Sequence, residues 1–370
     1  MKKALIHDWY YVNGGAEKVL NAINASWNDF EHFALVDFLN DSDRDFILNG
    51  KSVNTSFIQH LPTAKSNHRK FLQWFPYAIE QFDLREYDLV LSSSASIAKG
   101  VLTNQNQLHI CYCHSPMRYA WDLYHQYLED AKLTKGLKSI YAKYVLHKMR
   151  NWDISSVNRV DEFIANSNYI AKRIKKVYNR DSTVIYPPVD VNKFTLQEDK
   201  SDYYFTASRM VPYKKIELIV RTFNNLPNKK LIVSGDGPEF SNIKKIAKSN
   251  ITLLGFSSSD VLKEHLQNAK AFVFAAEEDF GIIPVEAQAC GTPVIGYGKG
   301  GLLETVIDGE TGVYFSEQTE ASIIKAVNKF ETLKFDHNLI RNHALKFSKE
   351  RFIKEITTFV EQKYKAFKLK

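Results

Sequence analysis

The 370-residue chain is 44% hydrophobic and 13% aromatic, which suits two packed domains of roughly 150–200 residues each and excludes a disordered protein. No stretch approaches the roughly 20 uncharged apolar residues of a membrane span. The net charge of +7 favours an anionic partner, but without a helix-turn-helix, RNP or zinc-finger pattern we expect no nucleic acid among the partners.

Strands alternate with helices in the first half of the chain, a pattern typical of parallel α/β sheets. Strands are predicted at Ala4–His7, His32–Val36, Asp88–Ser92, His109–Cys113, Glu162–Ala165 and Thr183–Ile185. Helices are predicted near Ala16–Asn24, Leu137–Val157 and Asn168–Tyr178. The segment Asp41–Asp45 has aspartates at alternate positions but follows no strong strand. We therefore interpret it as a solvated polar loop and not as a metal site.

The second half repeats the alternation after a Pro187-Pro188 pair, which cannot continue a helix and suits a stiff hinge at Tyr186–Asp190. Strands are predicted at Tyr203–Ala207, Lys230–Ser234, Thr252–Leu254, Ala271–Phe274 and Pro293–Gly296. Helices are predicted near Lys214–Asn224, Glu239–Lys248, Asp260–Asn268, Pro284–Ala289 and Glu320–Glu331.

The cysteines and the amino terminus indicate the compartment. The chain has three cysteines, Cys111, Cys113 and Cys290, and an odd count with two in one strand argues for a reducing cytoplasm and against a disulfide framework. No second thiol pair is present to complete a zinc site. The chain becomes acidic at Asp8, too early for a signal peptide. We expect a cytoplasmic protein.

The segment Glu278–Ile295 is the most informative of the chain. Glu278 lies in an acidic turn after a strand, and Glu286 lies eight positions later on the following helix, which ends at Gly291. A parallel βαβ unit of this kind places its turn at the carboxyl edge of the sheet, where open α/β sheets bind ligands. Carboxylates accept hydrogen bonds from sugar hydroxyls, so the pair suits a nucleotide sugar. Either glutamate alone could be a helix-start charge.

This segment resembles the donor-site signature of the retaining glycosyltransferases of family 4. The resemblance implies the GT-B fold, an α/β fold with two Rossmann-like doubly wound parallel-sheet domains facing across a cleft. It implies an acceptor-side domain at residues 1–187 and a nucleotide-sugar donor domain at residues 188–349. A final helix at about 350–370 would pack back on the first domain.

Two basic residues after the first strand of the second domain suit a diphosphate. Arg209 and Lys214 are five residues apart across a proline-containing turn. Arg209 supplies a planar fork of N–H donors, and Lys214 supplies a compact positive charge. In the resembled family the residues at these positions neutralise the leaving diphosphate. Lys215 departs from the glycine commonly found after that lysine. The paired glycines Gly14 and Gly15 would let a phosphate approach the backbone at a helix start, and in the family this loop faces the diphosphate.

The remaining donor-site assignments rest on the resemblance. The loops of Gly235 and of Gly255-Phe256 resemble those around the donor nucleoside. Glu286 is expected to hold the ribose hydroxyls, and Glu278 to hold hydroxyls of the donor sugar. The donor site is completed by the residues between these two glutamates, Phe280, Gly281, Ile282 and Ile283.

A segment rich in polar aromatic residues, Cys111–Tyr124, follows a strand of the first domain and suits sugar hydroxyls and ring faces. It resembles bacterial O-antigen mannosyltransferases of family 4, whose histidine at the position of His114 lies beside the donor sugar. The resemblance also places Asn166-Ser167 at the cleft. Residues assigned to the acceptor are Asp8, Arg118, Tyr119 and Trp121.

A basic amphipathic helix is predicted within Lys132–Arg150, with lysines at 135, 138, 143 and 148 among apolar residues. It could lie on an anionic membrane, or it could pack on its own domain. Both interpretations remain open at this point.

The predicted function is retaining hexosyl transfer, with mannose from GDP-mannose implied by the resemblance, to a saccharide acceptor in surface polysaccharide or lipopolysaccharide biosynthesis. The acceptor is expected to be carried by undecaprenyl diphosphate, which would place the protein peripherally on the inner face of the plasma membrane. No cofactor and no metal are expected. Two alternatives stay open: a GT-B nucleotide-sugar epimerase, and an inactive homologue acting as an interaction subunit.

Overall fold

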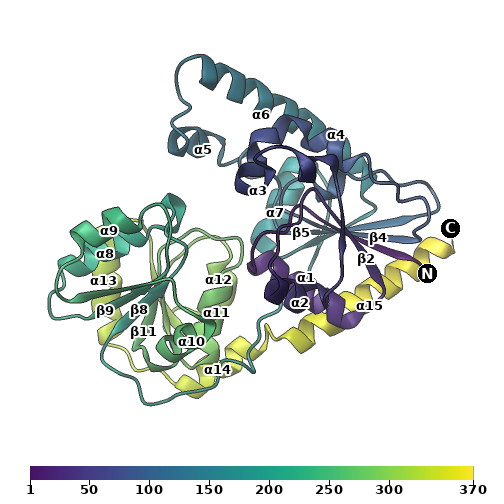
Figure 1. Ribbon diagram of the computed structural model, residues 1–370. Helices are drawn as coiled ribbons and strands as arrows, with labels where there is room; N and C mark the ends of the chain where they lie inside the picture. The colour runs from purple at the N-terminus through teal and green to yellow at the C-terminus, as the bar shows by residue number, and fades with distance from the viewer. Residues whose placement is uncertain (370) are drawn as a thin grey trace. The chain divides into compact units, whose positions relative to one another are not determined.

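The computed structural model describes residues 1–369, which form two compact units. Unit 1 comprises Met1–Pro188 and the segment from Phe352 onward, and unit 2 comprises Val189–Arg351. Each unit is built on its own parallel sheet with helices packed against it (Figure 1). The predicted α/β class with two Rossmann-like units is therefore confirmed.

The sheet of unit 1 has seven parallel strands in the order β3-β2-β1-β4-β5-β6-β7. They are β1 (Lys3–His7), β2 (Phe30–Ala34), β3 (Val53–Thr55), β4 (Leu89–Ser94), β5 (Leu108–Cys113), β6 (Glu162–Ala165) and β7 (Thr183–Val184). The central strands are buried along their whole length, as expected for a parallel sheet covered on both faces.

Helices cover both faces of this sheet. They are α1 (Gly15–Ser26), α2 (Asp41–Leu48), α3 (Ala64–Asn67), α4 (Phe75–Ile79), α5 (Tyr124–Asp130), α6 (Leu137–Ser155), α7 (Asn168–Tyr178) and α15 (Lys349–Lys368). Short 3₁₀ helices are η1 (Phe57–His60), η2 (His68–Trp74), η3 (Ala98–Gly100) and η4 (Ser156–Arg159). Helices α1, α2 and α15 pack on one face, and α4, α6 and α7 pack on the other.

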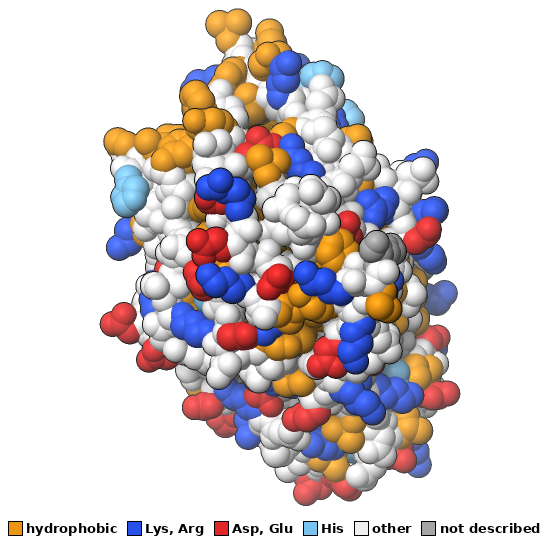
Figure 2. Space-filling view, turned by 90° about the vertical axis from the view of Figure 1, so that its right-hand side faces the viewer, with side chains coloured by type: hydrophobic (Ala, Val, Ile, Leu, Met, Phe, Trp, Pro, Cys, Tyr) orange, Lys and Arg blue, Asp and Glu red, His pale blue; other side chains and the backbone are white. Residues whose placement is uncertain are grey.

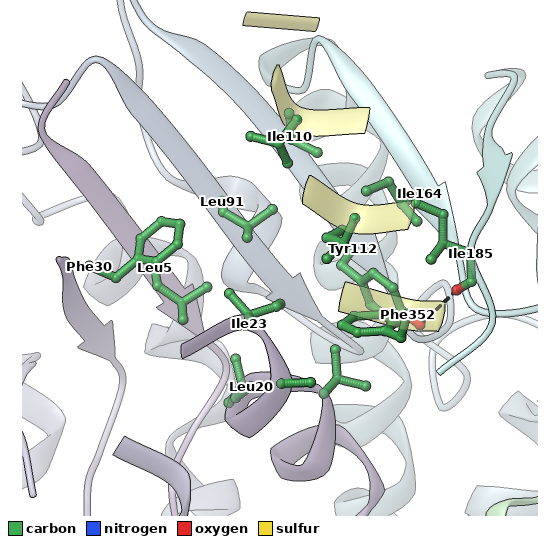
Figure 3. Close-up of a cluster of buried hydrophobic side chains, with 14 of the residues drawn as sticks. Leu5, Leu20, Ile23, Phe30, Leu91, Ile110, Tyr112, Ile164, Ile185 and Phe352 are labelled. Atoms are coloured by element: carbon green, nitrogen blue, oxygen red, sulfur yellow. Dashed lines mark hydrogen bonds between the residues drawn. The ribbon is translucent and has the colours of Figure 1, made fainter. Parts of the chain in front are cut away.

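The carboxyl-terminal helix α15 completes the core of unit 1 (Figure 3). Its residue Phe352 packs beside Tyr112 with ring centroids 5.9 Å apart, and the hydroxyl of Tyr112 donates a hydrogen bond of 2.9 Å to the carbonyl of Ile185. Lys363, further along α15, forms a 2.8 Å ion pair with Glu162. Removing α15 would therefore expose the part of this sheet face that α1 and α2 do not cover.

The sheet of unit 2 has six parallel strands in the order β10-β9-β8-β11-β12-β13. They are β8 (Tyr204–Ala207), β9 (Leu231–Ser234), β10 (Ile251–Gly255), β11 (Ala271–Phe274), β12 (Val294–Tyr297) and β13 (Gly312–Phe315). The helices are η5 (Pro212–Lys214), α8 (Ile216–Asn224), α9 (Phe240–Ile246), α10 (Ser259–Asn268), α11 (Ile282–Ala289), α12 (Leu302–Thr305), α13 (Glu320–Glu331) and α14 (His337–Leu345).

The structure corrects the interpretation of Asp41–Asp45 as a loop, because this segment begins helix α2. The side chain of Asn40 accepts a 2.8 Å hydrogen bond from the amide of Asp43 and caps the helix. The negative charges of two aspartates in the first turn interact favourably with the positive end of the helix dipole. Ile47 and Leu48 anchor the other end in the core. The short strands β3 and β13 were not predicted, because their three and four residues are too few to show a strand pattern.

Candidate active site

The carboxyl edge of the unit 2 sheet brings together the loops that the sequence assigned to the donor. Strands β9 and β10 lie on one side of β8, and β11 to β13 lie on the other. The order of strands therefore reverses between β8 and β11, the place at which open α/β sheets bind ligands. The loop Ser208–Lys215 follows β8, and the loop Glu277–Gly281 follows β11. Both predicted segments thus border this switch point.

Lys214 and Glu278 link these two loops directly. The ammonium of Lys214 donates a hydrogen bond to the carboxylate of Glu278, and the two side chains are 19% and 18% exposed. Lys214 ends η5, and its Nζ also lies 5.3 Å from the ring centre of Tyr213. The sequence had assigned the two residues to different parts of the donor and had not predicted that they form a pair.

Arg209 is exposed, and the backbone of its loop is held by contacts with the loop after β9. The amide of Met210 donates to the carbonyl of Asp236 at 2.9 Å. Gly235 has φ +133°, and a Cβ there would lie 1.9 Å from the carbonyl oxygen of Ser208. Only glycine permits this approach. Gly235 therefore supports the Arg209 loop, and its contact with a nucleoside stays a prediction.

The turn that carries Glu278 rests on a pair of glycines that the sequence analysis did not identify. The amide of Gly301 donates to the carbonyl of Glu278 at 2.8 Å. A Cβ at Gly300 would lie 2.4 Å from that same oxygen, and one at Gly301 would lie 2.4 Å from the carbonyl oxygen of Asp279. The run Gly298-Lys299-Gly300-Gly301 directly after β12 was the available signal, since paired glycines after a strand mark close backbone approach.

The residues around the start of α11 differ in how far their side chains are buried. Gly281 is the N-cap of α11 with φ +87°, and Ile282 and Ile283 are half-buried behind it. Phe280 is buried and packs edge-on against Phe347 at 5.5 Å. Glu286 is also buried on α11. Donor contacts for these five residues stay predictions.

Phe256 stands at the end of β10 with 85% of its surface exposed, the most exposed aromatic side chain among residues 1–369. Gly255 before it has φ +72° and turns the chain away from the sheet. The carbonyl of Gly255 accepts a 2.8 Å hydrogen bond from the amide of Gly235, which ties the two loops together. An exposed ring on a fixed turn suits stacking with a planar ligand.

In unit 1, a backbone amide of the glycine loop after β1 is already hydrogen-bonded to a carboxylate of the same chain. The amide of Gly14 donates to the carboxylate of Glu17 at 3.1 Å, and Gly15 begins α1. Glu17 is buried and reaches back to form half of a capping box. Binding of a diphosphate by Gly14 and Gly15 stays a prediction, and it would require Glu17 to release this amide.

A series of polar contacts through His7 and Ser93 connects Glu17 with His114. Glu17 lies 3.5 Å from Nε2 of His7, and Nδ1 of His7 donates to the carbonyl of Ser93 at 3.0 Å. The hydroxyl of Ser93 is 2.8 Å from Nε2 of His114. Of these four residues, only His114 was predicted from the sequence. The polar residues His7 and Ser93 at the ends of two buried strands were the signal for the others.

The two histidines have opposite protonation preferences. Burial opposes the charged form of His7, but the hydrogen bond and charge of Glu17, aided by Asp8 and the Ser93 carbonyl, raise its pKa. Burial and the neighbouring His7 lower the pKa of His114 to about 3. His114 is therefore a neutral imidazole near pH 7, which can exchange hydrogen bonds with a hydroxyl.

Asp8 is buried, and its carboxylate holds a backbone loop. It accepts hydrogen bonds from the amides of Ala95 at 2.7 Å, Ile97 at 2.7 Å and Ala98 at 2.8 Å. These bonds fix the turn after β4. The structure gives Asp8 this supporting contact, and its contact with an acceptor stays a prediction.

Two further acceptor assignments, Tyr119 and Trp121, fall on the segment after β5. The hydroxyl of Tyr119 bonds to that of Ser96 at 2.6 Å, and burial raises the pKa of Tyr119. The indole of Trp121 donates to Asp153 at 2.7 Å, and Asp153 is the buried ion-pair partner of Lys99 at 2.9 Å. Trp121 is therefore anchored to the interior.

The other residues of the predicted cleft have varied surroundings. Arg118 is half-buried. Ser167 caps α7 by accepting a 3.1 Å hydrogen bond from the amide of Ile170, and Asn166 precedes it at the sheet edge. Sugar binding by these residues stays a prediction.

The side chains of residues 1–369 include no group of three or more His, Cys, Asp or Glu arranged to hold a metal ion. All three cysteines are buried and free. Within the same range, no helix is both long and apolar enough to cross a bilayer.

Comparisons with known families cover both units. The family described as Glycosyltransferase Family 4 matches residues 14–193, and the family described as Glycosyl transferases group 1 matches residues 190–346. The D-inositol 3-phosphate glycosyltransferase of Mycobacterium sp. (strain JLS) is 28% identical over 184 residues, which cover 42% of this chain and 41% of that protein. An uncharacterized glycosyltransferase of Methanocaldococcus jannaschii is 29% identical over 214 residues, covering 55% of this chain and 60% of that protein. The chain thus spans about half the length of the curated relatives that it matches.

Solved structures resemble the whole chain in fold. Anabaena HepE in complex with UDP superposes with a TM-score of 0.69 at 16% identity, covering 98% of this chain and 100% of that one. The lipopolysaccharide outer core galactosyltransferase WaaB, in its apo form, gives a TM-score of 0.65 at 17% identity, with the same coverage.

Proposed function

Because this chain joins a glycosyltransferase family 4 domain to a glycosyl transferases group 1 domain, we propose that it transfers a hexose from a nucleotide diphosphate sugar to a saccharide acceptor, with retention at the anomeric carbon. The observation that supports this most is the Lys214–Glu278 pair at the switch point of unit 2, with exposed Arg209 in the same loop as Lys214. It supplies two cations for a diphosphate and one carboxylate for sugar hydroxyls.

The diphosphate of the donor carries more negative charge than a single carboxylate, so it competes with Glu278 for Lys214. Arg209 binds the same group through its fork of N–H donors. Glu278, relieved of Lys214, then accepts hydrogen bonds from the sugar. When the bond between the anomeric carbon and the phosphate oxygen breaks, the two cations stabilise the charge that develops on the leaving diphosphate.

Same-face attack by the acceptor is consistent with the contacts of two buried carboxylates of unit 1, Asp8 and Glu17. Asp8 is engaged by three backbone amides, and Glu17 is engaged by Gly14 and lies beside His7. A side chain held in this way is poorly placed to form a covalent intermediate. In our proposal the acceptor hydroxyl attacks the anomeric carbon from the side of the leaving group and passes its proton to the departing phosphate oxygen. His114, as a neutral imidazole, contacts the transferred ring.

The donor that we propose is GDP-mannose, on the resemblance of the segment around His114 to O-antigen mannosyltransferases. A uridine nucleotide is the second candidate, because HepE was solved with UDP. We propose a lipid-linked saccharide acceptor in surface polysaccharide synthesis; WaaB, of similar fold, is named as a lipopolysaccharide galactosyltransferase. We further propose that no metal is required, since Arg209 and Lys214 neutralise the diphosphate.

Thermal shift with GDP-mannose, UDP-glucose and UDP-N-acetylglucosamine tests the donor, since a ligand of the folded state raises the melting temperature with its occupancy. Product analysis with and without a saccharide acceptor, repeated in EDTA, tests transfer. Arg209→Ala should lower turnover by about 10² or more, while Arg221→Ala on the exposed side of α8 should not. Interconversion of sugars without acceptor would show an epimerase. Absence of both donor binding and turnover would indicate an interaction subunit.

A further inference from the structure

Helix α6 has two apolar faces, only one of which is used by the fold. Val145, Leu146 and Met149 are buried against unit 1. On the opposite side, Leu137, Ile140, Tyr141 and Tyr144 are 85%, 66%, 55% and 57% exposed. Their spacing of three and four residues aligns them on one stripe, which we call the outer face of α6. A packing role therefore explains only half of the hydrophobic residues of this helix.

Basic side chains surround the outer face. From Ala131 to Trp152 the chain contains six Lys and Arg and no Asp or Glu. At 100° per residue, Lys138 and Lys143 lie on the two flanks of the outer face, and Lys148 lies on it. The ammonium of Lys148 is 5.5 Å from the ring centre of Tyr144.

The neighbouring helix η2 brings one more exposed aromatic residue close to this surface. The hydroxyl of Tyr141 donates to the side chain of Gln73 at 2.6 Å, which joins α6 to the end of η2. Trp74, the next residue, is 49% exposed. Figure 1 shows α6 on the outside of unit 1 alongside α4, and Figure 2 shows hydrophobic side chains gathered with basic ones at the upper end of the view.

We infer that the outer face of α6 docks on an anionic lipid surface. Apolar and aromatic side chains with flanking lysines are the composition of helices that lie in the membrane interface. Lysine stems bend toward lipid headgroups while the apolar residues enter the acyl boundary. A second copy of the chain fits poorly, because a two-fold contact would bring two lysine-rich faces without carboxylates together. The proposal does not depend on the sugar or the nucleotide.

Sedimentation with vesicles tests this proposal on the full-length protein. The unaltered protein should bind vesicles of phosphatidylglycerol and phosphatidylcholine, bind pure phosphatidylcholine at least about tenfold more weakly, and lose binding as salt increases. Leu137→Gln with Ile140→Gln and Tyr144→Gln should abolish binding. So should Lys135→Glu with Lys138→Glu, Lys143→Glu and Lys148→Glu, because each Lys near an anionic surface contributes about fivefold.

A matched control changes four exposed lysines of unit 2 to Glu, at Lys244, Lys245, Lys325 and Lys334. This control has the same net charge as the α6 lysine variant and should retain binding. Circular dichroism and thermal melting check that every variant is folded, which is expected since all the altered residues are exposed. No binding by the unaltered protein, equal binding to neutral vesicles, or equal loss in the control would overturn the proposal. So would a dimer that dissociates only in the apolar variant without any binding to vesicles.

Discussion

Lys214 and Glu278, which follow the adjacent strands β8 and β11, form an ion pair across the switch point of the unit 2 sheet. The two side chains are only 19% and 18% exposed, so desolvation offsets much of their attraction while water still reaches both charged groups, and the net contribution of the pair to stability is small. The contact holds both groups in place at the sheet edge. A change in either residue should therefore alter activity far more than folding.

A double-mutant cycle with Lys214→Met and Glu278→Gln measures this difference. We expect a coupling of at most about 1 kcal/mol in the free energy of unfolding, from urea denaturation. Turnover should fall by about 10² or more for Lys214→Met, because the proposed mechanism loses a charge that acts on the leaving group. An altered unfolding free energy of several kcal/mol with normal turnover would make the pair purely structural.

Asp8→Asn should destabilise unit 1. The substitution replaces a charged acceptor of three backbone hydrogen bonds by a neutral amide, and we expect a loss of about 2–4 kcal/mol in the free energy of unfolding. The control Asp41→Asn, in the exposed first turn of α2, should cost less than about 1 kcal/mol. If Asp8→Asn kept full stability and lost only transfer, the result would contradict this supporting role and favour the acceptor assignment.

His32 should make the protein sensitive to acid. It is buried in β2, and among residues 1–369 neither ring nitrogen has a hydrogen-bond partner. Burial, with the charges of Lys51 and His7, lowers its pKa from 6.5 to about 4. The unfolded chain takes up this proton first, so the stability that neutral His32 provides above about pH 6.5 is lost as the pH falls toward 4. The size of this pKa shift limits the loss of unfolding free energy to about 3 kcal/mol.

Urea unfolding between pH 7.5 and 4.5 measures this effect. His32→Leu should flatten the pH dependence, whereas His60→Leu, at an exposed position of η1, should leave the profile unchanged. His109 contributes in the same sense, since burial also lowers its pKa to about 4, whereas buried His7, whose pKa is raised, contributes in the opposite sense. An unaltered slope in His32→Leu would contradict the assignment.

Lys215→Gly should stabilise unit 2. Lys215 adopts a left-handed conformation, with φ 57° and ψ 30°, at the residue before α8. A side chain costs roughly 1–2 kcal/mol there, and the greater freedom of unfolded glycine offsets part of the gain. We expect an increase of about 0.5–1 kcal/mol in unfolding free energy by thermal melting. Lys215→Ala retains the Cβ and should show no such increase; a gain of equal size in that variant would rule out backbone strain as the cause.

Much of the fold was predictable because its signals are local. The bounds of β6, α7, β11 and α13 agree with the prediction to the residue, since each is bordered by a turn or a cap. The predicted start of α8 at Lys214 was wrong, because the left-handed Lys215 separates η5 from the helix. A lysine in place of glycine concealed that break.

The sequence by itself determined which loops carry charge and glycine, and hence which ends of the parallel strands could form a site. Only the tertiary structure decided the partners of those charges. Lys214 meets Glu278 across 64 residues, and Asp8 meets the loop Ala95–Ala98 across almost 90. It also decided that α6 buries one apolar face and exposes another. Strand pairing between distant segments sets these contacts, whereas the pattern along a chain reports only neighbours within a turn of helix or a pleat of strand.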